Sequence, residues 1–281
     1  MDLDAKPFCL DFVGVGPQRT GTSWLHELLS VHPQLRFPKN VKETMFFDRH
    51  YRKGVRWYSR HFAHCESDQL CGEIAPTYFD VECVPSRIHQ LNPACKIIVS
   101  LRNPVDRAWS LYRHHLGRGF TRKNLAEAIV QYPRIVDAGL YSRHIPRWLD
   151  IFGTTQVTFV FLEDIASNPE AVLGSIYEFL AVEAMPMPSK GYKKFSLASA
   201  PRFPWLAKWV TWVAVWLRGE RLHEIVELGK AMGFRKIYTG GKDVSPLSPN
   251  DRQRLLEIYE QDVEFVENLL GRDLSSWRQI T

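Results

Sequence analysis

The chain contains 281 residues, with 45% hydrophobic and 24% charged residues and a formal net charge of +5. This is the composition of an ordinary globular protein, and the length suffices for one large domain with a substantial core. The mildly basic balance favours anionic ligands, but no run of lysine and arginine is dense enough to indicate a nucleic-acid-binding protein.

The N-terminus and the cysteines bear on where the protein works. Met1-Asp2-Leu3-Asp4 is acidic and lacks the apolar region of a secretory signal. The five cysteines are odd in number and form no C-x-x-C pair; they are Cys9, Cys65, Cys71, Cys83 and Cys95. The simplest interpretation is a reduced, cytoplasmic protein, with a disulfide between Cys65 and Cys71 as the less favoured alternative.

Strand-like runs alternate with helical patterns along the chain. Strands are predicted at residues 9–15, 35–38, 70–75, 96–101 and 156–161. Helices are predicted at residues 22–29, 81–90, 125–131, 139–152, 168–181 and 248–270, with a further helix that begins at Pro104. The run 156–161 is the richest in β-forming residues and is predicted to be a central strand.

This alternation predicts an α/β fold in which a central parallel sheet is covered by helices on both faces. We expect a single domain over residues 1–281, with a nucleotide-binding core at about 8–182 and a helical lid and C-terminal portion at about 183–281. Ligands of such sheets bind at the carboxyl ends of the strands. Because Gly16, Glu73 and Arg102 all lie at predicted strand ends, the motifs that contain them should converge.

The first predicted strand leads into a turn with two glycines, Gly16 and Gly21, and then into a helix. Backbone N–H groups of such a turn and the positive end of the helix dipole together form a cradle for an anion. Arg19 adds a positive charge to this cradle. Hydroxyl groups are supplied by Thr20, Thr22 and Ser23. We therefore expect a bound phosphate; the alternative is an ordinary turn that contains two glycines.

The loop differs from that of nucleoside triphosphatases, which reads G-x-x-x-x-G-K-[ST]. Thr22 occupies the lysine position, and the strand 96–101 leads into Arg102 instead of a metal-binding aspartate. A site that lacks both the lysine and the aspartate is poorly equipped for phosphoryl transfer from a magnesium nucleotide. It suits a nucleotide that is bound without a metal. A small-molecule kinase is therefore a less favoured alternative.

Arg102 and Ser110 indicate a second phosphate site. Arg102 leaves the strand end, and Ser110 falls two turns into the following helix. The pair can hold one more phosphate, Arg102 through a bidentate fork and Ser110 through its hydroxyl. The alternative is that Arg102 caps loop carbonyls and Ser110 only packs.

These motifs resemble those of the sulfotransferases that use 3′-phosphoadenylyl sulfate (PAPS). Gly16–Trp24 resembles the loop that holds the 5′-phosphosulfate, and Leu101–Ser110 resembles the 3′-phosphate motif. Lys42–Asp48 and Gly72–Phe79 are similar to two segments of the heparan-sulfate-type branch, Lys-Glu-x-His-Phe-Phe-Asp and Glu-Lys-[Ser/Thr]-Pro-x-Tyr, and residues 247–277 resemble the C-terminal helix and tail of bacterial members. The resemblance implies a P-loop-like three-layer fold, PAPS as donor, adenosine 3′,5′-bisphosphate as product and no metal. The implied donor contacts are Gln18, Arg19, Thr20, Gly21, Thr22, Ser23, Trp24, Arg102 and Ser110.

The resemblance also implies that Glu43 is the base that takes the acceptor's proton. A carboxylate beside Lys42 and near Arg19 suits a proton acceptor, and these two cations would meet the charge that develops on the bridging oxygen. The alternative for Glu43 is a surface carboxylate paired with Lys42 or Lys39. Other branches use a histidine, and the alternatives here, for each of which a structural role is favoured, are His61, His64, His114 and His115.

The chain departs from the heparan-sulfate-type pattern at three positions. Met45 replaces the histidine of the first segment, and Ile74 and Ala75 replace the Lys and Ser/Thr of the second. These changes remove one imidazole and one cation from the site. We therefore expect donor binding but not heparan sulfate as the acceptor, which stays open among hydroxyls or amines of carbohydrates, lipids and small molecules.

Residues 203–217 carry four tryptophans at helical spacing on one face, Trp205, Trp209, Trp212 and Trp216. The segment is too short to span a bilayer, and a buried or dimer-forming helix is favoured. The alternatives are a peripheral helix at the inner face of the membrane or a lid over an apolar acceptor. Arg202, just before it, is a further candidate for a nucleotide contact. The competing hypothesis is a nucleotide-binding, membrane-associated protein without transferase activity.

Overall fold

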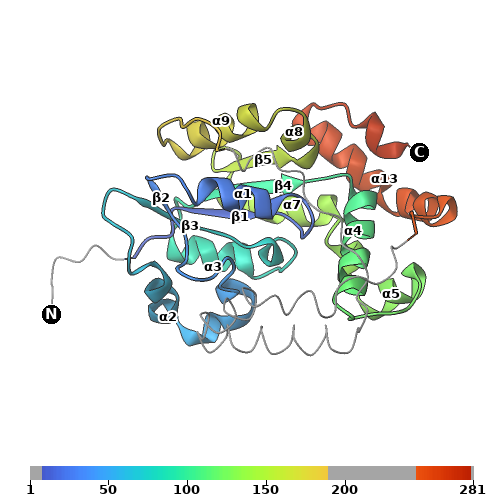
Figure 1. Cartoon of the computed structure of the whole chain (residues 1–281), viewed down its shortest axis with the longest axis horizontal. Coiled ribbons are helices and arrows are strands. Elements are labelled where there is room, and N and C mark those ends of the chain that lie inside the picture. The colour runs from blue at the N-terminus through green and yellow to red at the C-terminus, as the bar shows by residue number, and fades with distance from the viewer. Residues whose placement is uncertain (1–7, 189–244, 280–281) are drawn as a thin grey trace. The chain divides into compact units, whose positions relative to one another are not determined.

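The computed structural model of the protein describes residues 8–188 and 245–279 (Figure 1). The chain divides into two compact units, residues 1–102 with 143–194 and residues 103–142 with 195–281. The expected boundary near residue 183 stays a prediction. Arg202 and the four tryptophans lie outside the described residues.

A five-stranded parallel sheet forms the centre of the first unit (Figure 1). Its strands are β1 (Phe12–Val15), β2 (Leu35–Arg36), β3 (Leu70–Ile74), β4 (Lys96–Leu101) and β5 (Val157–Phe161). Their order is β2-β3-β1-β4-β5, and every neighbouring pair is parallel. The predicted parallel sheet is thus confirmed, and the carboxyl ends of β1, β3 and β4 lie side by side.

β5 lies at an edge of this sheet, so the prediction that residues 156–161 form a central strand was wrong. In the described part of the chain β5 pairs with β4 alone, with Ile97 opposite Val157 and Leu101 opposite Phe161. β-Branched and aromatic residues indicate how side chains pack on the two faces of a sheet, and this packing does not determine a strand's place in the order.

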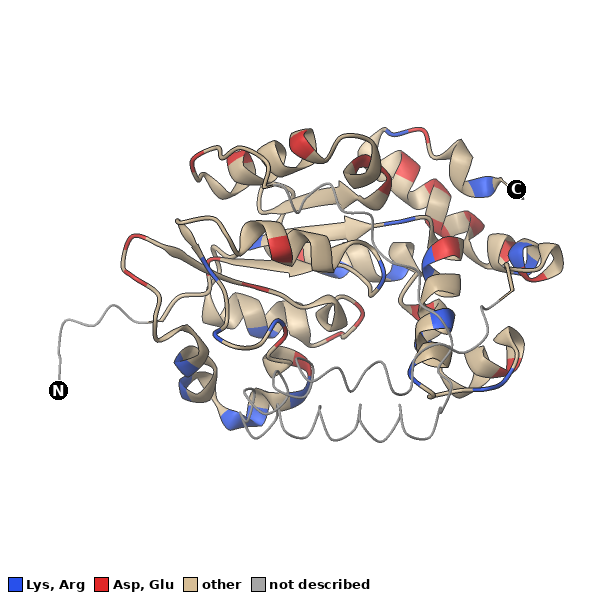
Figure 2. Cartoon of the chain, viewed as in Figure 1, with Lys and Arg blue, Asp and Glu red and all other residues tan. Residues whose placement is uncertain are grey.

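Short helical turns connect β2 to β3 in the first unit. They are η1 (Phe46–His50), η2 (Tyr51–Lys53), α2 (Val55–Ser59) and η3 (Arg60–Phe62), and η4 (Pro76–Tyr78) follows β3. Figure 2 shows Lys and Arg gathered along the stretch from η1 to η3. Its exposed cations are Arg49, Arg52, Lys53, Arg56 and Arg60. Asp48 is the single acidic residue between positions 46 and 62, so this segment is strongly basic.

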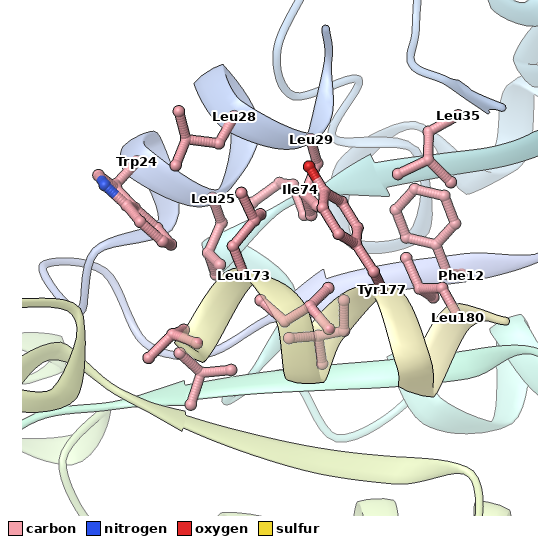
Figure 3. Close-up of a cluster of buried hydrophobic side chains, with 14 of the residues drawn as sticks. Phe12, Trp24, Leu25, Leu28, Leu29, Leu35, Ile74, Leu173, Tyr177 and Leu180 are labelled. Atoms are coloured by element: carbon pink, nitrogen blue, oxygen red, sulfur yellow. The ribbon is translucent and has the colours of Figure 1, made fainter. Parts of the chain in front are cut away.

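One face of the sheet is covered by α1 (Thr22–Leu29), α8 (Leu162–Ser167) and α9 (Pro169–Leu180). Figure 3 shows side chains of α1 and α9 facing each other beside Phe12 of β1 and Ile74 of β3. The labelled members from the two helices are Trp24, Leu25, Leu28, Leu29, Leu173, Tyr177 and Leu180. Burying one such side chain stabilises the fold by about 1.5–3 kcal/mol. This cluster fixes α1 against the sheet, with its N-terminus at the carboxyl end of β1.

The other face carries α3 (Val84–Leu91) and α7 (Tyr141–Phe152). The crossovers β3–α3–β4 and β4–α7–β5 run along the sheet in the opposite direction to β1–α1–β2, so right-handed connections place these helices opposite α1. The rings of His89 and Phe152 join the two helices, with centroids 5.7 Å apart. Glu73 points to this face, because it lies opposite Val13 and next to Ile74, which belongs to the cluster on the α1 face.

Cys65 and Cys71 form a disulfide, with sulfur atoms 2.20 Å apart, so the expectation that all cysteines are reduced was wrong for this pair. The turn between them brings them together, since the backbone N–H of Gln69 donates to the carbonyl of Glu66 at 3.2 Å. Cys9, Cys83 and Cys95 are not part of this disulfide.

The second unit is helical in its described part. It contains α4 (Pro104–Gly117), α5 (Leu125–Gln131), α6 (Arg134–Asp137), α13 (Pro249–Leu270) and η6 (Ser275–Arg278). Pro104 starts α4 as predicted, and the side chain of Asn103 caps the helix by accepting from the N–H of Val105 at 2.9 Å. The buried hydroxyl of Tyr259 donates to the carbonyl of Val136 at 3.0 Å, which ties α13 to α6. Among the described helices of both units, we find none with the length and apolar content to cross a bilayer.

Candidate functional site

The turn between β1 and α1, residues 16–23, is hereafter the phosphate loop. Gly16 has a φ of +129° and touches β4 so closely that a Cβ there would lie 2.4 Å from Ser100 Oγ and 2.5–2.6 Å from the Ser100 backbone. Arg19 and Gly21 also have left-handed backbones, with φ of 80° and 94°. Left-handed conformations favour glycine, and one at arginine is uncommon outside sites where the surrounding structure imposes it.

The hydroxyl of Thr20 braces the phosphate loop from inside. Thr20 is fully buried, and its Oγ1 donates to the carbonyl of Pro17 at 2.8 Å and lies 2.6 Å from Ser100 Oγ. Trp24 is also buried, within the cluster under α1. The side chains of Thr20 and Trp24 are therefore buried in contacts within the protein. These two residues can bind an anion only through their backbone N–H groups.

The start of α1 is open to an anion. Its N-cap is Gly21, which has no side chain to accept hydrogen bonds from the first N–H groups of the helix. Ser23 is exposed and Gln18 and Arg19 are half-buried, whereas Thr22 is buried. Unsatisfied N–H groups and the positive helix end together attract a phosphate or sulfate.

Arg102 contacts the phosphate loop. It follows β4 directly, and its Nη1 donates to the carbonyl of Arg19 at 3.3 Å. The expected convergence of the motifs at Gly16 and Arg102 is thus observed, and so is the carbonyl cap that was the alternative role for Arg102. Ser110 lies on α4, in the second unit, so its pairing with Arg102 on one phosphate stays a prediction.

Lys42 links the phosphate loop to Glu43. Its Nζ lies 3.3 Å from Ser23 Oγ, to which it donates, and 3.4 Å from Glu43 Oε1. Both side chains of the ion pair are partly buried, with 27% and 21% exposed. Burial lowers the pKa of Lys42, and the neighbouring Glu43 opposes this shift. The adjacent Lys42 and Glu43 are thus linked, through the Lys42 ammonium, to a hydroxyl of the phosphate loop 19 residues away in sequence.

Glu73, at the end of β3, receives four hydrogen bonds although it is fully buried. Its Oε1 accepts from the backbone N–H of Thr44, and its Oε2 accepts from the hydroxyls of Thr44 at 3.0 Å, Tyr58 at 3.0 Å and Tyr78 at 3.2 Å. Burial raises the pKa of Glu73 to about 7, although these hydrogen bonds act in the opposite direction. Sequence reasoning placed Glu73 at a strand end but predicted no hydrogen-bond partner for it. The signal that could have indicated a buried, hydrogen-bonded carboxylate is a single acidic residue within an apolar strand.

Histidines occupy several positions in and around the site. His26 of α1, which sequence reasoning did not single out, packs on Phe37 with ring centroids 5.2 Å apart. Burial first, and then the charge of Lys42, lower the pKa of His26 to about 4, so it is a neutral imidazole. Of the predicted alternative bases, His61 is buried against Trp57 and His64 is exposed. His114 and His115 lie on α4, in the second unit.

The parallel sheet has an anion-binding loop after β1, and a lysine–carboxylate pair lies beside that loop. This arrangement is a P-loop-like fold. Residues 11–197 match the family described as the sulfotransferase domain. The chain therefore belongs to the sulfotransferase family, and the resemblance drawn from its motifs is confirmed.

Curated relatives include enzymes of heparan sulfate. Human bifunctional heparan sulfate N-deacetylase/N-sulfotransferase 2 is 36% identical over 193 residues, which are 61% of this chain and 22% of that protein. Human heparan sulfate glucosamine 3-O-sulfotransferase 6 is 32% identical over 202 residues, 69% of this chain and 57% of that protein. The chain thus spans less than two thirds of the length of these relatives. Its fold is similar to that of a sulfotransferase from Alicyclobacillus acidocaldarius, with a TM-score of 0.71, 24% identity and coverage of 96% and 98% of the two chains.

Proposed function

We propose that the protein transfers a sulfuryl group from PAPS to a hydroxyl or amine of an acceptor, with Glu43 as the base. The observation that carries this proposal is the position of Lys42, whose Nζ lies within 3.4 Å of both a phosphate-loop hydroxyl and the Glu43 carboxylate. Transfer requires a held donor, an in-line acceptor and a group to take the acceptor's proton. The phosphate loop holds the donor, and Glu43 of the pair Lys42–Glu43 takes the acceptor's proton.

The site suits the 5′-phosphosulfate of PAPS. The N–H groups at the start of α1 and the exposed Ser23 hydroxyl can donate to its oxygens, and Arg19 supplies charge. Thr20 and Trp24 contribute through their backbone N–H groups, because their side chains are buried. Arg102, already at the loop, is the proposed ligand of the 3′-phosphate together with Ser110, and Arg202 is a further candidate.

The chain's own residues then perform three tasks. When bound, PAPS supplies the sulfuryl group and the nucleotide that leaves. Glu43 accepts the proton of the acceptor hydroxyl or amine as that group attacks. Lys42 and Arg19 stabilise the negative charge that develops on the bridging oxygen, and partial burial strengthens this interaction.

The acceptor we favour is an acidic carbohydrate. The basic segment from η1 to η3 begins three residues after Glu43 and carries five exposed cations. Such a surface attracts an anionic chain toward the base. The two human relatives are named for heparan sulfate, and the replacements at Met45, Ile74 and Ala75 are our reason to expect a different acidic glycan.

Calorimetric titration with adenosine 3′,5′-bisphosphate, with magnesium ATP as the comparison, tests the donor site. We expect micromolar affinity for the bisphosphate and a loss of about 10- to 100-fold in Arg102→Ala, because a charge-assisted contact is removed. A preference for magnesium ATP would favour a kinase. Binding without turnover in any acceptor screen would favour a non-catalytic nucleotide-binding protein.

Glu43→Gln tests the base. We expect transfer from PAPS to fall by about 10²- to 10⁴-fold while bisphosphate affinity changes by less than about 3-fold. Glu27→Gln is the matched control, since Glu27 is an exposed carboxylate of α1 whose charge also acts on Lys42. Equal activity of both variants would show that Glu43 is not the base.

A further inference from the structure

We propose that Glu73 is a positioning residue for sulfuryl transfer: from the core it holds the segment 42–44, hereafter the base segment, against the phosphate loop. This inference rests on the proposed function for its catalytic consequence. Glu73 has no exposed surface, so it acts on the reaction through the residues that it anchors.

The anchor operates on the chain next to Glu43. Both the backbone N–H and the hydroxyl of Thr44 donate to the two carboxylate oxygens of Glu73, so one residue is held by two bonds. Thr44 is joined directly to Glu43, and two bonds to one residue fix its position and its orientation. These bonds thereby restrain the backbone from which the Glu43 side chain extends.

A relay through Tyr78 extends the anchor beyond Thr44. The Tyr78 hydroxyl donates to Glu73 and accepts from the backbone N–H of Phe46 at 2.9 Å. The Phe46 N–H is also 3.2 Å from Thr44 Oγ1. The backbone is therefore held at Phe46, after Met45, as well as at Thr44, before it.

The backbone around the base segment needs such support. Asn40 and Met45 flank it, and both have left-handed conformations, with φ of 64° and 54°. A left-handed backbone at a residue with a Cβ costs free energy and persists where surrounding contacts impose it. The hydrogen bonds from Thr44 and Phe46 into the Glu73 network are contacts of this kind.

Above the Glu73 pKa of about 7, the ionised carboxylate suits this position better than an amide. Four donors converge on the side chain of Glu73, and a carboxylate has about four acceptor sites and no donor. Glutamine has the same shape but turns two N–H groups toward hydroxyls. Glu73→Gln therefore weakens the anchor while preserving the volume of the core.

Hydrogen–deuterium exchange on the full chain above pH 7, where Glu73 is ionised, tests the inference without an acceptor. In Glu73→Gln we expect the amides of residues 42–47 to lose at least about 10-fold of their protection, because the Thr44 amide loses its carboxylate partner. The amides of β1 and α1 should exchange as before, and the bisphosphate affinity should change by less than about 3-fold. With PAPS, kcat should fall with little change in KM, and Glu73→Asp should recover part of it.

A merely structural role gives a different pattern. It predicts a lower Tm and faster exchange throughout the sheet, and this result, or unchanged protection at Thr44, would overturn the inference. Should Glu73→Gln not fold, Tyr78→Phe removes only the relay, and the same local loss at 44–47 is expected. Its control is Tyr177→Phe, a buried tyrosine of α9 whose hydroxyl makes no hydrogen bond in the described part of the chain. A wild-type chain that binds no bisphosphate would refute the proposed function, yet the exchange pattern would still report on the anchor.

Discussion

The phosphate loop and the base segment serve the same reaction in our proposal, but they are held by different means. The phosphate loop is held by its own backbone, through positive φ angles at three residues and the fit of Gly16 against Ser100. The base segment is held by the side chain of Glu73, 29 residues away from Thr44 in sequence. One half of the site is thus built from a turn and the other from a buried carboxylate.

This difference determines how each half should fail. A turn fitted against a strand tolerates no added atom, so damage to the phosphate loop should abolish donor binding. A network of hydrogen bonds loosens in steps, so damage to the base segment should reduce turnover and leave donor binding intact. Loss of donor binding after damage to the base segment alone would contradict this separation.

Gly16→Ala should have the largest effect on the phosphate loop. The added methyl would lie 2.4–2.6 Å from three atoms of Ser100, two of them in the backbone, at a φ of +129°. We expect bisphosphate affinity to fall by more than about 100-fold, measured by calorimetry, together with a lower Tm. Gly153→Ala is the control, because Gly153 also has a positive φ of +71° but nothing lies within 4 Å of the added carbon. Wild-type affinity in Gly16→Ala would place the donor elsewhere.

The pH dependence of stability should reveal the Glu73 network. The folded protein keeps a proton on Glu73 up to a pKa of about 7, whereas the unfolded chain releases it near 4.5. Between these values the folded state binds more protons, so this group's contribution to the free energy of unfolding is full below pH 4.5 and falls as pH rises to 7. The slope is at most about 1.4 kcal/mol per pH unit.

Denaturant unfolding of wild type and Glu73→Gln between pH 4.5 and 7.5 measures this slope. The variant should lack the decrease, so the difference between the two curves isolates Glu73 from other carboxylates. The charged or titratable groups around the network are Tyr58, Tyr78, Cys95 and Asp48. Burial raises the pKa values of both tyrosines and of Cys95, so these three groups stay neutral in this range. Parallel curves would show that Glu73 does not titrate in this window.

Ser100→Ala should have the smallest effect. It removes the partner of the buried Thr20 hydroxyl but leaves that hydroxyl its bond to Pro17. We expect a loss of about 1 kcal/mol in the free energy of unfolding and of about 3- to 10-fold in bisphosphate affinity. The base segment should exchange as in wild type. Ser175→Ala, which removes an exposed hydroxyl of α9, should change neither quantity; a larger change at residues 42–47 than in the phosphate loop would contradict the separation.

The sequence by itself determined the parallel α/β fold, the phosphate loop and its family. Helix α1 and strand β4 were predicted with their observed bounds, because glycine spacing and apolar runs act over a few neighbouring residues. Arg19, Glu43 and Arg102 could be singled out because their motifs are contiguous.

The tertiary structure alone decided what holds these residues. Strand order put β5 at the edge, and a turn joined Cys65 to Cys71. The bracing of Thr20 by Ser100 and of Thr44 by Glu73 spans 80 and 29 residues. The sheet decides which strand ends lie close together, and buried polar groups there form hydrogen bonds with one another. Because the partners are far apart in sequence, no local sequence pattern predicts these pairs.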